Sequence, residues 1–204
     1  MTPKRYDKGY FDRWYRNPSR RVKGPAELAR KVALAIAAAE QVLGRPLRSV
    51  IDVGAGEGRW QPVLQRLRPG TRYAGLDGSE YAVRRFGRRR NLRLAAFGDL
   101  AESGAEGPYD LVVCSDVMHY VAAAELRRGA AALPALIGGV AFLDLLTSAD
   151  GVEGDLRGFF RRSGAWYRGV FREAGLVPLG LHCWTTPAIA RTLPALEQPL
   201  PRSR

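Results

Sequence analysis

A short glycine-rich segment constrains the fold of this chain more than any other feature. The apolar run 49–53 leads directly into Gly54, Gly56 and Gly58, and a helical stretch begins near Arg59. Glycine lets the backbone approach a ligand closely, and the free N–H groups at a helix N-terminus attract polar or anionic groups. Three glycines within five residues exceed what a tight turn needs. The segment therefore predicts a strand, a ligand-binding turn and a helix.

Short apolar runs and helical stretches alternate along most of the chain. Pro25 opens and Gly44 ends a long first helix. The runs predict strands at 49–53, 72–76, 92–96, 109–114, 140–146 and 176–183, and the intervening stretches predict helices at 59–68, 122–136 and 166–174, with one more helix capped by Ser79. This alternation is typical of the α/β class, here a Rossmann-like, doubly wound and mostly parallel sheet with an N-terminal helical cap.

The chain of 204 residues is short enough for one domain. We expect a basic and aromatic cap or lid at 1–23, the main domain at 24–193 and a frayed, proline-rich tail at 194–204. The long polar loop 147–165 is predicted to be functional or mobile.

Composition excludes several classes of protein. Hydrophobic residues make up 46% and charged residues 25%, which excludes disordered, collagen-like and disulfide-scaffold chains. Cys114 and Cys183 form no disulfide framework, and no Cys/His cluster has zinc spacing, so we expect no metal. The most apolar run, 133–146, is too short to span a membrane, and no secretory signal is evident, which predicts a cytoplasmic protein. The net charge is +12, but 28 of the 32 basic residues are arginine, which is as typical of compositional bias as of a binding surface.

The glycine spacing indicates which kind of ligand binds. A nicotinamide or flavin fingerprint would need its third glycine where Arg59 stands. The segment 50–59 instead resembles motif I of the class I S-adenosylmethionine-dependent methyltransferases, and the resemblance covers about residues 45–180. Asp77 matches the family's ribose-binding carboxylate, Asp99 the acidic residue that meets the adenine amino group, and 109–116 the strand that ends beside the sulfonium.

The resemblance implies S-adenosylmethionine as the cofactor and S-adenosylhomocysteine as the product. The residues expected to bind the cofactor are Asp52, Gly54, Ala55, Gly56, Gly58, Asp77, Gly78, Ser79, Asp99, Leu100 and Ser115. For Asp52 we favour a structural role that holds the glycine turn over direct contact. Asp99 is equally well interpreted as an ordinary loop carboxylate.

The residues after the fourth predicted strand are expected near the reacting methyl group. Asp116 and His119 are the candidate catalytic residues, and His119 could act as a general base. Because a sulfonium is already activated, packing against the cofactor is the favoured role for His119. His182 is interpreted as structural, in a strand or at its end. The tentative acceptor contacts are Tyr10, Trp14, Tyr120, Phe159 and Trp166.

Two basic segments keep alternative interpretations. The aromatic residues of 1–23 could pack as part of the core, close as a lid over the cofactor, or stack with nucleic-acid bases, and their neighbours Arg13, Arg16, Arg20 and Arg21 could clamp an anionic group. The arginine-rich run 84–90 is predicted to be a solvated helix end, with a nucleic-acid contact as the minority interpretation.

Missing motifs narrow the acceptor. After the fourth strand the chain reads Ser115-Asp116-Val117-Met118, without the Asn/Asp-Pro-Pro-aromatic motif of enzymes that methylate base amines or glutamine amides. We therefore expect methyl transfer to nitrogen, oxygen or sulfur of a small molecule. The alternatives are an RNA- or protein-directed methyltransferase that uses the basic surface, and a cofactor-binding module without catalysis. The sequence leaves monomer or dimer open, and only one of the family's two final antiparallel strands is evident.

Overall fold

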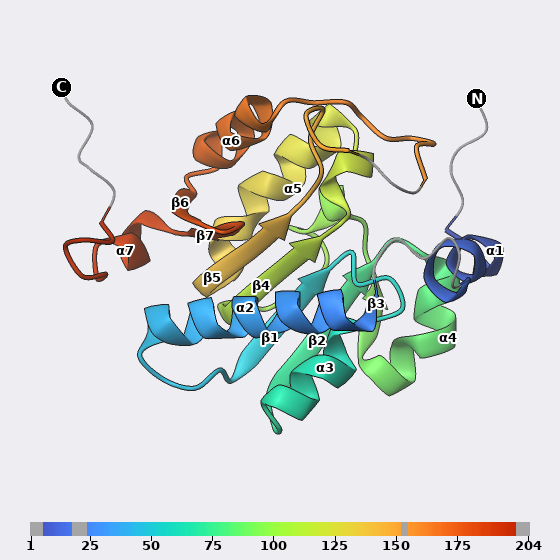
Figure 1. The fold of residues 1–204 in the computed structure, drawn as a ribbon, viewed down its shortest axis with the longest axis horizontal. Coiled ribbons are helices and arrows are strands. Elements are labelled where there is room, and N and C mark those ends of the chain that lie inside the picture. Colours follow the sequence, from blue (N-terminus) through green and yellow to red (C-terminus); the bar gives the residue numbers. More distant parts are fainter. Residues whose placement is uncertain (1–5, 18–23, 152–154, 199–204) are drawn as a thin grey trace.

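The computed structural model describes residues 6–17, 24–151 and 155–198. Its centre is a seven-stranded sheet in the order β3-β2-β1-β4-β5-β7-β6 (Figure 1). The strands are β1 Ser49–Val53, β2 Arg72–Asp77, β3 Leu92–Leu94, β4 Tyr109–Ser115, β5 Ile137–Asp144, β6 Val177–Gly180 and β7 Cys183–Thr185. β1 to β5 pair in parallel, whereas β7 runs antiparallel to both β5 and β6. The predicted Rossmann-like, doubly wound fold is thereby confirmed.

Helices cover both faces of the sheet (Figure 1). The longer helices are α2 Pro25–Leu43, α3 Trp60–Leu67, α4 Glu80–Arg90, α5 Ala123–Leu136 and α6 Gly164–Glu173. The shorter ones are α1 Lys8–Phe11, η1 Asp12–Arg16, η2 Phe97–Asp99, η3 Met118–Tyr120 and α7 Pro187–Ala190. α2 and α3 pack on one face through Ile36 and Leu64, and α5 and α6 pack on the other through Leu133 and Phe171. Within the described ranges, no helix has both the length and the apolarity needed to cross a membrane.

The topology indicates at which edge of the sheet a ligand can bind. The strand order reverses between the hydrogen-bonded neighbours β1 and β4. The helices that follow these two strands, α3 and α5, lie on opposite faces of the sheet. In such sheets a crevice opens at the carboxyl ends of the strands at this point. The loops after β1, β2, β4 and β5 all start at that edge. The candidate cofactor and catalytic residues therefore lie on converging loops.

The end of the chain corrects one sequence prediction. The predicted single strand 176–183 is a hairpin of β6 and β7, so the last strand of the sheet is present. Leu181 and His182 form its two-residue turn with φ of 48° and 65°. Such turns favour Asn and Gly, and neither residue carries that signal. His182 lies in this exposed turn and not in a strand.

The boundaries of β5 also differ from the prediction. The strand runs from Ile137 to Asp144 instead of 140–146. Helix α5 continues past Pro134 and passes into β5 at Ile137 without a loop, so no turn residue marks the start. Asp144 consequently ends the strand at the ligand-binding edge, beside the end of β4.

Candidate functional site

The glycine turn after β1 is folded against its neighbours. The N–H groups of Gly54 and Ala55 donate to the carbonyl of Leu76, at 2.7 and 2.9 Å. Gly54 has a φ of 76°, and a Cβ atom there would lie 2.2 Å from Cγ2 of Val117. Only glycine therefore fits between this turn and the segment that follows β4. A Cβ atom at Gly58 would instead face Leu92 and Arg90, on the side of β3 and α4, and Gly58 lines neither pocket, so its contact with a cofactor stays a prediction.

Asp77, at the end of β2, ties two loops together. Its Oδ2 accepts from the N–H of Gly56 at 2.6 Å, and its Oδ1 accepts from the N–H of Ser79 at 2.7 Å. Burial raises the pKa of Asp77, and the two backbone hydrogen bonds partly offset that rise. Ser79 in turn caps α4 by accepting from the N–H of Ala82, as predicted. A carboxylate offers about four acceptor positions, so Asp77 can still accept from a ligand's hydroxyl groups.

The larger of two adjoining pockets, about 290 Å³, lies over these loops. It is lined by Tyr6, Tyr10, Phe11, Tyr15, Gly54, Gly56, Asp77, Gly78, Ser79, Ala95, Ala96, Phe97, Gly98, Asp116, Val117, Tyr120, Val121 and Glu125. Five predicted cofactor residues from two loops thus meet in one pocket. Asp99 and Leu100 do not line it, because Leu100 is buried in the core and the carboxylate of Asp99 lies at the surface, 3.1 Å from Arg128.

The second pocket, about 110 Å³, lies beyond the end of β4. It is lined by Tyr10, Trp14, Tyr15, Leu28, Lys31, Asp52, Gly54, Ala55, Arg59, Trp60, Ser115, Asp116, His119, Tyr120, Leu146 and Asp155. The residues that line both pockets are Tyr10, Tyr15, Gly54, Asp116 and Tyr120. The two pockets therefore meet at Asp116, directly after β4.

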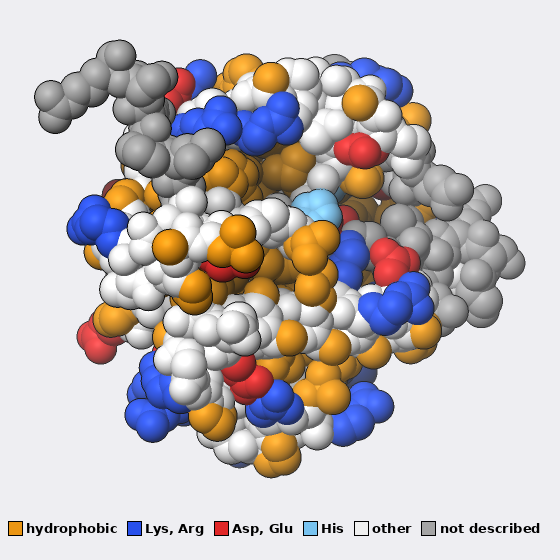
Figure 2. Space-filling view, turned by 60° about the vertical axis from the view of Figure 1, so that its left-hand side comes forward, with side chains coloured by type: hydrophobic (Ala, Val, Ile, Leu, Met, Phe, Trp, Pro, Cys, Tyr) orange, Lys and Arg blue, Asp and Glu red, His pale blue; other side chains and the backbone are white. Residues whose placement is uncertain are grey.

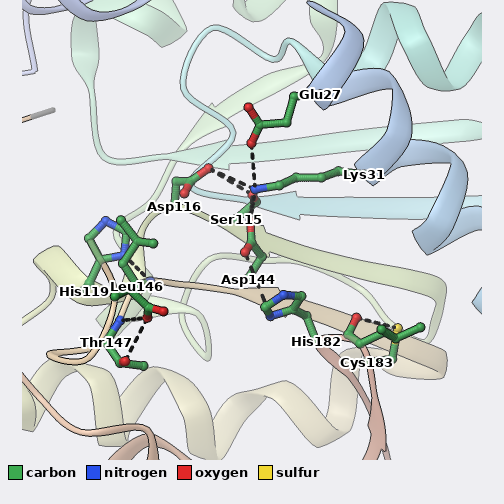
Figure 3. Close-up of polar contacts among 12 residues, drawn as sticks. Glu27, Lys31, Ser115, Asp116, His119, Asp144, Leu146, Thr147, His182 and Cys183 are labelled. Atoms are coloured by element: carbon green, nitrogen blue, oxygen red, sulfur yellow. Dashed lines mark hydrogen bonds and ion pairs between the residues drawn. The ribbon is translucent and has the colours of Figure 1, made fainter. Parts of the chain in front are cut away.

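Asp116 is held in an unusual backbone conformation at this junction. Its φ is 63°, a left-handed value that a non-glycine residue adopts at an energetic cost. Its N–H donates to the carbonyl of Asp144 at 2.8 Å, which fixes the residue across the ends of β4 and β5. The Oγ of Ser115 lies 3.2 Å from Oδ2 of Asp116 and 2.8 Å from Oδ2 of Asp144 (Figure 3). Strain of this kind is concentrated at functional sites.

Lys31 reaches this junction from helix α2. Its ammonium forms an ion pair with the buried carboxylate of Asp144 (Figure 3). The same ammonium is 3.8 Å from Oε1 of Glu27 and 3.9 Å from Oδ2 of Asp116. The exposed side chain of His182 lies next to Asp144, with its Nδ1 3.9 Å from Oδ1 of Asp144. One lysine thus lies among three carboxylates at the wall of the second pocket.

His119 lines the second pocket but is itself buried. Its Nδ1 accepts from the backbone N–H of Leu146 at 3.2 Å, and its ring lies 4.3 Å from that of Tyr120 and 5.2 Å from that of Phe159. The side chain thereby holds the segment after β5 in place. A packing role accounts for these contacts without a proton transfer.

Two tentative acceptor contacts lie elsewhere. Phe159 packs behind His119 and lines neither pocket. Trp166 lies on α6 between two guanidinium groups, with Arg162 at 4.5 Å and Arg127 at 5.4 Å from its ring. Neither residue lines a pocket, and a contact of either with an acceptor stays a prediction.

The segment 6–16 forms a roof over both pockets. Phe11 is buried and its ring lies 5.7 Å from that of Tyr81 on α4. The hydroxyl of Ser79 donates to the carbonyl of Tyr6 at 2.5 Å, and Arg16 forms an ion pair with Glu57 of the glycine turn. The segment is thus attached to the same loops that line the larger pocket. Its π-helical part, η1, carries Trp14 and Tyr15 toward the second pocket, and π-turns are frequent at functional sites.

Burial also acts on the titratable groups of the pocket walls. Burial raises the pKa of Tyr10 well above its usual range, and nearby Tyr15 adds to the rise. Burial, and then Asp155, raise the pKa of Tyr120 to about 12. These hydroxyls therefore stay neutral, so the tyrosine side chains that line the pockets carry no charge. Asp52 is buried beneath the turn, where it accepts from the hydroxyl of Tyr73 at 2.8 Å.

Sequence reasoning missed several residues of the second pocket. Lys31 sits on the amphipathic helix α2, where a lysine is indistinguishable from an ordinary solvated residue. Arg59 directly follows the glycine turn, and this position in the sequence could have indicated that it lines a pocket. Arg20 and Arg21 lie outside the described residues. The run 84–90 ends α4, where Arg84, Arg85, Arg88 and Arg89 are exposed and line neither pocket.

Comparisons with known proteins agree with this geometry. A family model described as a methyltransferase domain matches residues 51–137. The sugar N-methyltransferase KedS8 from Streptoalloteichus sp. ATCC 53650 has a similar structure, with a TM-score of 0.60 and 20% identity over 74% of this chain and 80% of that one. DesVI from Streptomyces venezuelae gives a TM-score of 0.59 and 17% identity over 75% and 85%. No curated protein matches the chain in sequence.

A third similar structure is longer. An O-methyltransferase family protein from Burkholderia thailandensis gives a TM-score of 0.51 and 18% identity, and the match covers 79% of this chain but 58% of that protein. At such identities the structural likeness concerns the fold, while the domain match concerns the family.

Proposed function

We propose that this chain is a class I S-adenosylmethionine-dependent methyltransferase and that it methylates a small molecule held in the second pocket. The observation that carries the proposal is the position of this pocket. It adjoins the larger pocket at Asp116 and lies beneath the aromatic roof of Tyr10, Trp14 and Tyr15. A polynucleotide backbone would need an open groove at this place. The sugar N-methyltransferase among the similar structures supports a small-molecule acceptor.

The donor set of the larger pocket fits S-adenosylmethionine. Asp77 has acceptor positions left for two ribose hydroxyls, and Gly54 lets the glycine turn that lines the pocket pack directly against Val117. Phe97 and Gly98 line the end of the pocket where an adenine ring would lie. Arg59 lines the adjoining second pocket, where its guanidinium suits the carboxylate of the methionine part. The bound cofactor supplies a methyl group already activated by a sulfonium charge.

The chain's own residues then orient the cofactor and the acceptor and shield them from water. The roof 6–16 excludes water from the junction, and the strained Asp116 places a carboxylate where the two pockets meet. His119 keeps the segment after β5 against the pocket wall. In this proposal placement and electrostatics supply the catalysis, and no strong base is required. Whether Asp99 reaches an adenine amino group stays a prediction.

The test uses methyl-labelled S-adenosylmethionine, the protein and a total cell extract. The label is then divided among the small-molecule, RNA and protein fractions. We expect it in the small-molecule fraction. Label in RNA or protein would overturn the proposal in favour of the macromolecular alternative, and no label with S-adenosylhomocysteine still bound in a calorimetric titration would favour a silent binding module.

A further inference from the structure

The larger pocket has one end that lies away from the second pocket. The residues at this end follow β3 or lie around the start of α5, and the second pocket shares none of them: Ala95, Ala96, Phe97, Gly98, Val121 and Glu125. Apolar walls of this kind suit the faces of a planar ring, and a few polar groups among them fix its orientation. Glu125 is the acidic residue of this end.

Close packing of α5 on η2 brings Glu125 to this end of the pocket. A Cβ atom at Gly129 of α5 would lie 2.1 Å from the carbonyl oxygen of Phe97, so only glycine lets the helix approach η2 this closely. A Cβ atom at Gly98 of η2 would lie 3.0 Å from Cβ of Glu125. The first turn of α5, which carries Glu125, is therefore held directly against the backbone of the pocket wall.

The carboxylate of Glu125 is free to accept from a ligand. In the parts of the chain that the structure describes, no hydrogen bond or ion pair engages it. Arg128 lies three residues further along α5, but its guanidinium is bonded to η2. Its Nε donates to the carbonyl of Gly98 at 2.8 Å, and its Nη2 donates to Oδ1 of Asp99 at 3.1 Å. The acceptor positions of Glu125 are thus available at the rim of the pocket.

Asp99 is the acid that the motif predicts for the adenine amino group, but it lines neither pocket. Its side chain is 57% exposed and is paired with Arg128 at the surface. To contact a ligand in the pocket, Asp99 would have to give up this ion pair, whereas Glu125 already lines the wall. The geometry therefore favours Glu125 over Asp99 as the acid beside a bound ring.

We propose that Glu125 recognises the adenine of S-adenosylmethionine by accepting a hydrogen bond from its exocyclic amino group. This inference rests on the proposed function, in which Asp77 binds the ribose and the methionine part lies toward the second pocket. The adenine then lies at the opposite end, between the segment after β3 and the start of α5. A carboxylate at that place accepts from an amino group and has no donor for an oxygen substituent.

Two ligands that differ in one amino group test the inference without turnover. S-adenosylhomocysteine is compared by calorimetric titration with the analogue in which unsubstituted purine replaces adenine. We expect S-adenosylhomocysteine to bind about tenfold more tightly, because a hydrogen bond to a charged acceptor is lost in the analogue. Equal affinities would overturn the inference alone. If the protein binds neither ligand, the proposed function is contradicted and the inference falls with it.

Variants of Glu125 locate the preference for the amino group. Glu125→Ala should abolish the preference and leave the affinity for the purine analogue unchanged. Glu125→Gln keeps a neutral acceptor, and we expect it to retain only part of the preference. Glu102→Ala removes an exposed carboxylate that lines neither pocket, so it is the matched control and should keep the full preference. If Glu125→Ala weakens both ligands equally, Glu125 only shapes the pocket and the inference is wrong.

Asp99→Asn distinguishes the motif residue from Glu125. The amide still offers an oxygen to Arg128, so this variant should keep the full preference for S-adenosylhomocysteine. If Asp99→Asn loses as much of the preference as Glu125→Gln, or more, the motif carboxylate binds the adenine and the inference is overturned.

Discussion

At the scale of single residues, Asp77 is expected to dominate cofactor binding. Its carboxylate fixes the N–H groups of Gly56 and Ser79 and still faces the larger pocket. Hydrogen bonds to a charged group contribute about 1.5–3 kcal/mol each. Asp77→Ala should therefore weaken S-adenosylhomocysteine binding at least about tenfold, far more than His119→Ala, as measured by calorimetry. Asp99→Ala is the comparison for an exposed carboxylate, and equal, negligible losses in all three variants would contradict the assignment.

Asp52 should make stability depend on pH. Burial raises the pKa of its carboxyl to about 7, with a smaller opposing effect from Tyr73, whereas an unfolded chain would show about 3.9. Between these values the folded protein holds a proton that the unfolded chain has lost, so its stability falls as pH rises from about 4 to about 7. Asp52→Asn removes this slope and still accepts from Tyr73.

Urea unfolding at several pH values measures the effect of Asp52. At pH 8 the free energy of unfolding of Asp52→Asn should exceed that of the unaltered protein by a few kcal/mol, and this difference should disappear near pH 4. A difference that stays constant across this range would show that burial of Asp52 does not shift its titration.

At the scale of elements, the roof 6–16 should control cofactor release. Arg16 joins the roof to the glycine turn through Glu57, while Lys8, among the described residues, pairs with Asp12 of the roof itself, at 2.6 Å. Arg16→Ala should speed the dissociation of S-adenosylhomocysteine several-fold in stopped-flow measurements. Lys8→Ala is the matched control and should leave the rate unchanged. Equal rates in both variants would mean that the ion pair does not hold the roof closed.

The β6–β7 turn offers a gain in stability. Leu181 is 72% exposed and adopts a φ of 48°, a conformation in which Asn is more readily accommodated than Leu. Leu181→Asn should stabilise the protein by about 0.5–1 kcal/mol, which thermal unfolding would show as a rise in Tm of a few degrees. A fall in Tm would mean that the Leu181 side chain has packing contacts in solution that outweigh its backbone strain.

The sequence predicts those elements and site residues whose signals are local in the chain. Periodicity, the Ser79 cap and the glycine turn are local, and the elements they predicted are present. The β6–β7 turn has no such local signal, since Leu and His give none. The same holds for the site, because the motif residues Asp77 and Asp116 were found, while Lys31 enters the second pocket only through the packing of α2 on the sheet. Tertiary placement of a motif-free residue cannot be read from its neighbours in the chain.

At the scale of the whole molecule, varying the salt concentration tests whether the net charge of +12 takes part in binding the acceptor. On the face drawn in Figure 2 the basic side chains lie in several separate groups and do not form one continuous stripe. Binding to a nucleic acid releases counterions, so its affinity would fall steeply between 50 and 200 mM salt. Recognition inside the second pocket involves partly buried groups, which salt screens much less. We therefore expect the methyl-transfer rate at low acceptor concentration to change less than about twofold over this range.

A variant of α4 separates surface charge from catalysis. Changing Arg84, Arg85, Arg88 and Arg89 to Gln removes exposed charge that lines neither pocket. The rate with a small-molecule acceptor should remain as in the unaltered protein, while any non-specific retention of the protein on an RNA column should decrease. If the rate with the natural acceptor falls together with RNA retention, the arginines of α4 bind that acceptor. Methylation would then take place on a nucleic acid, with the roof 6–16 opening to admit it.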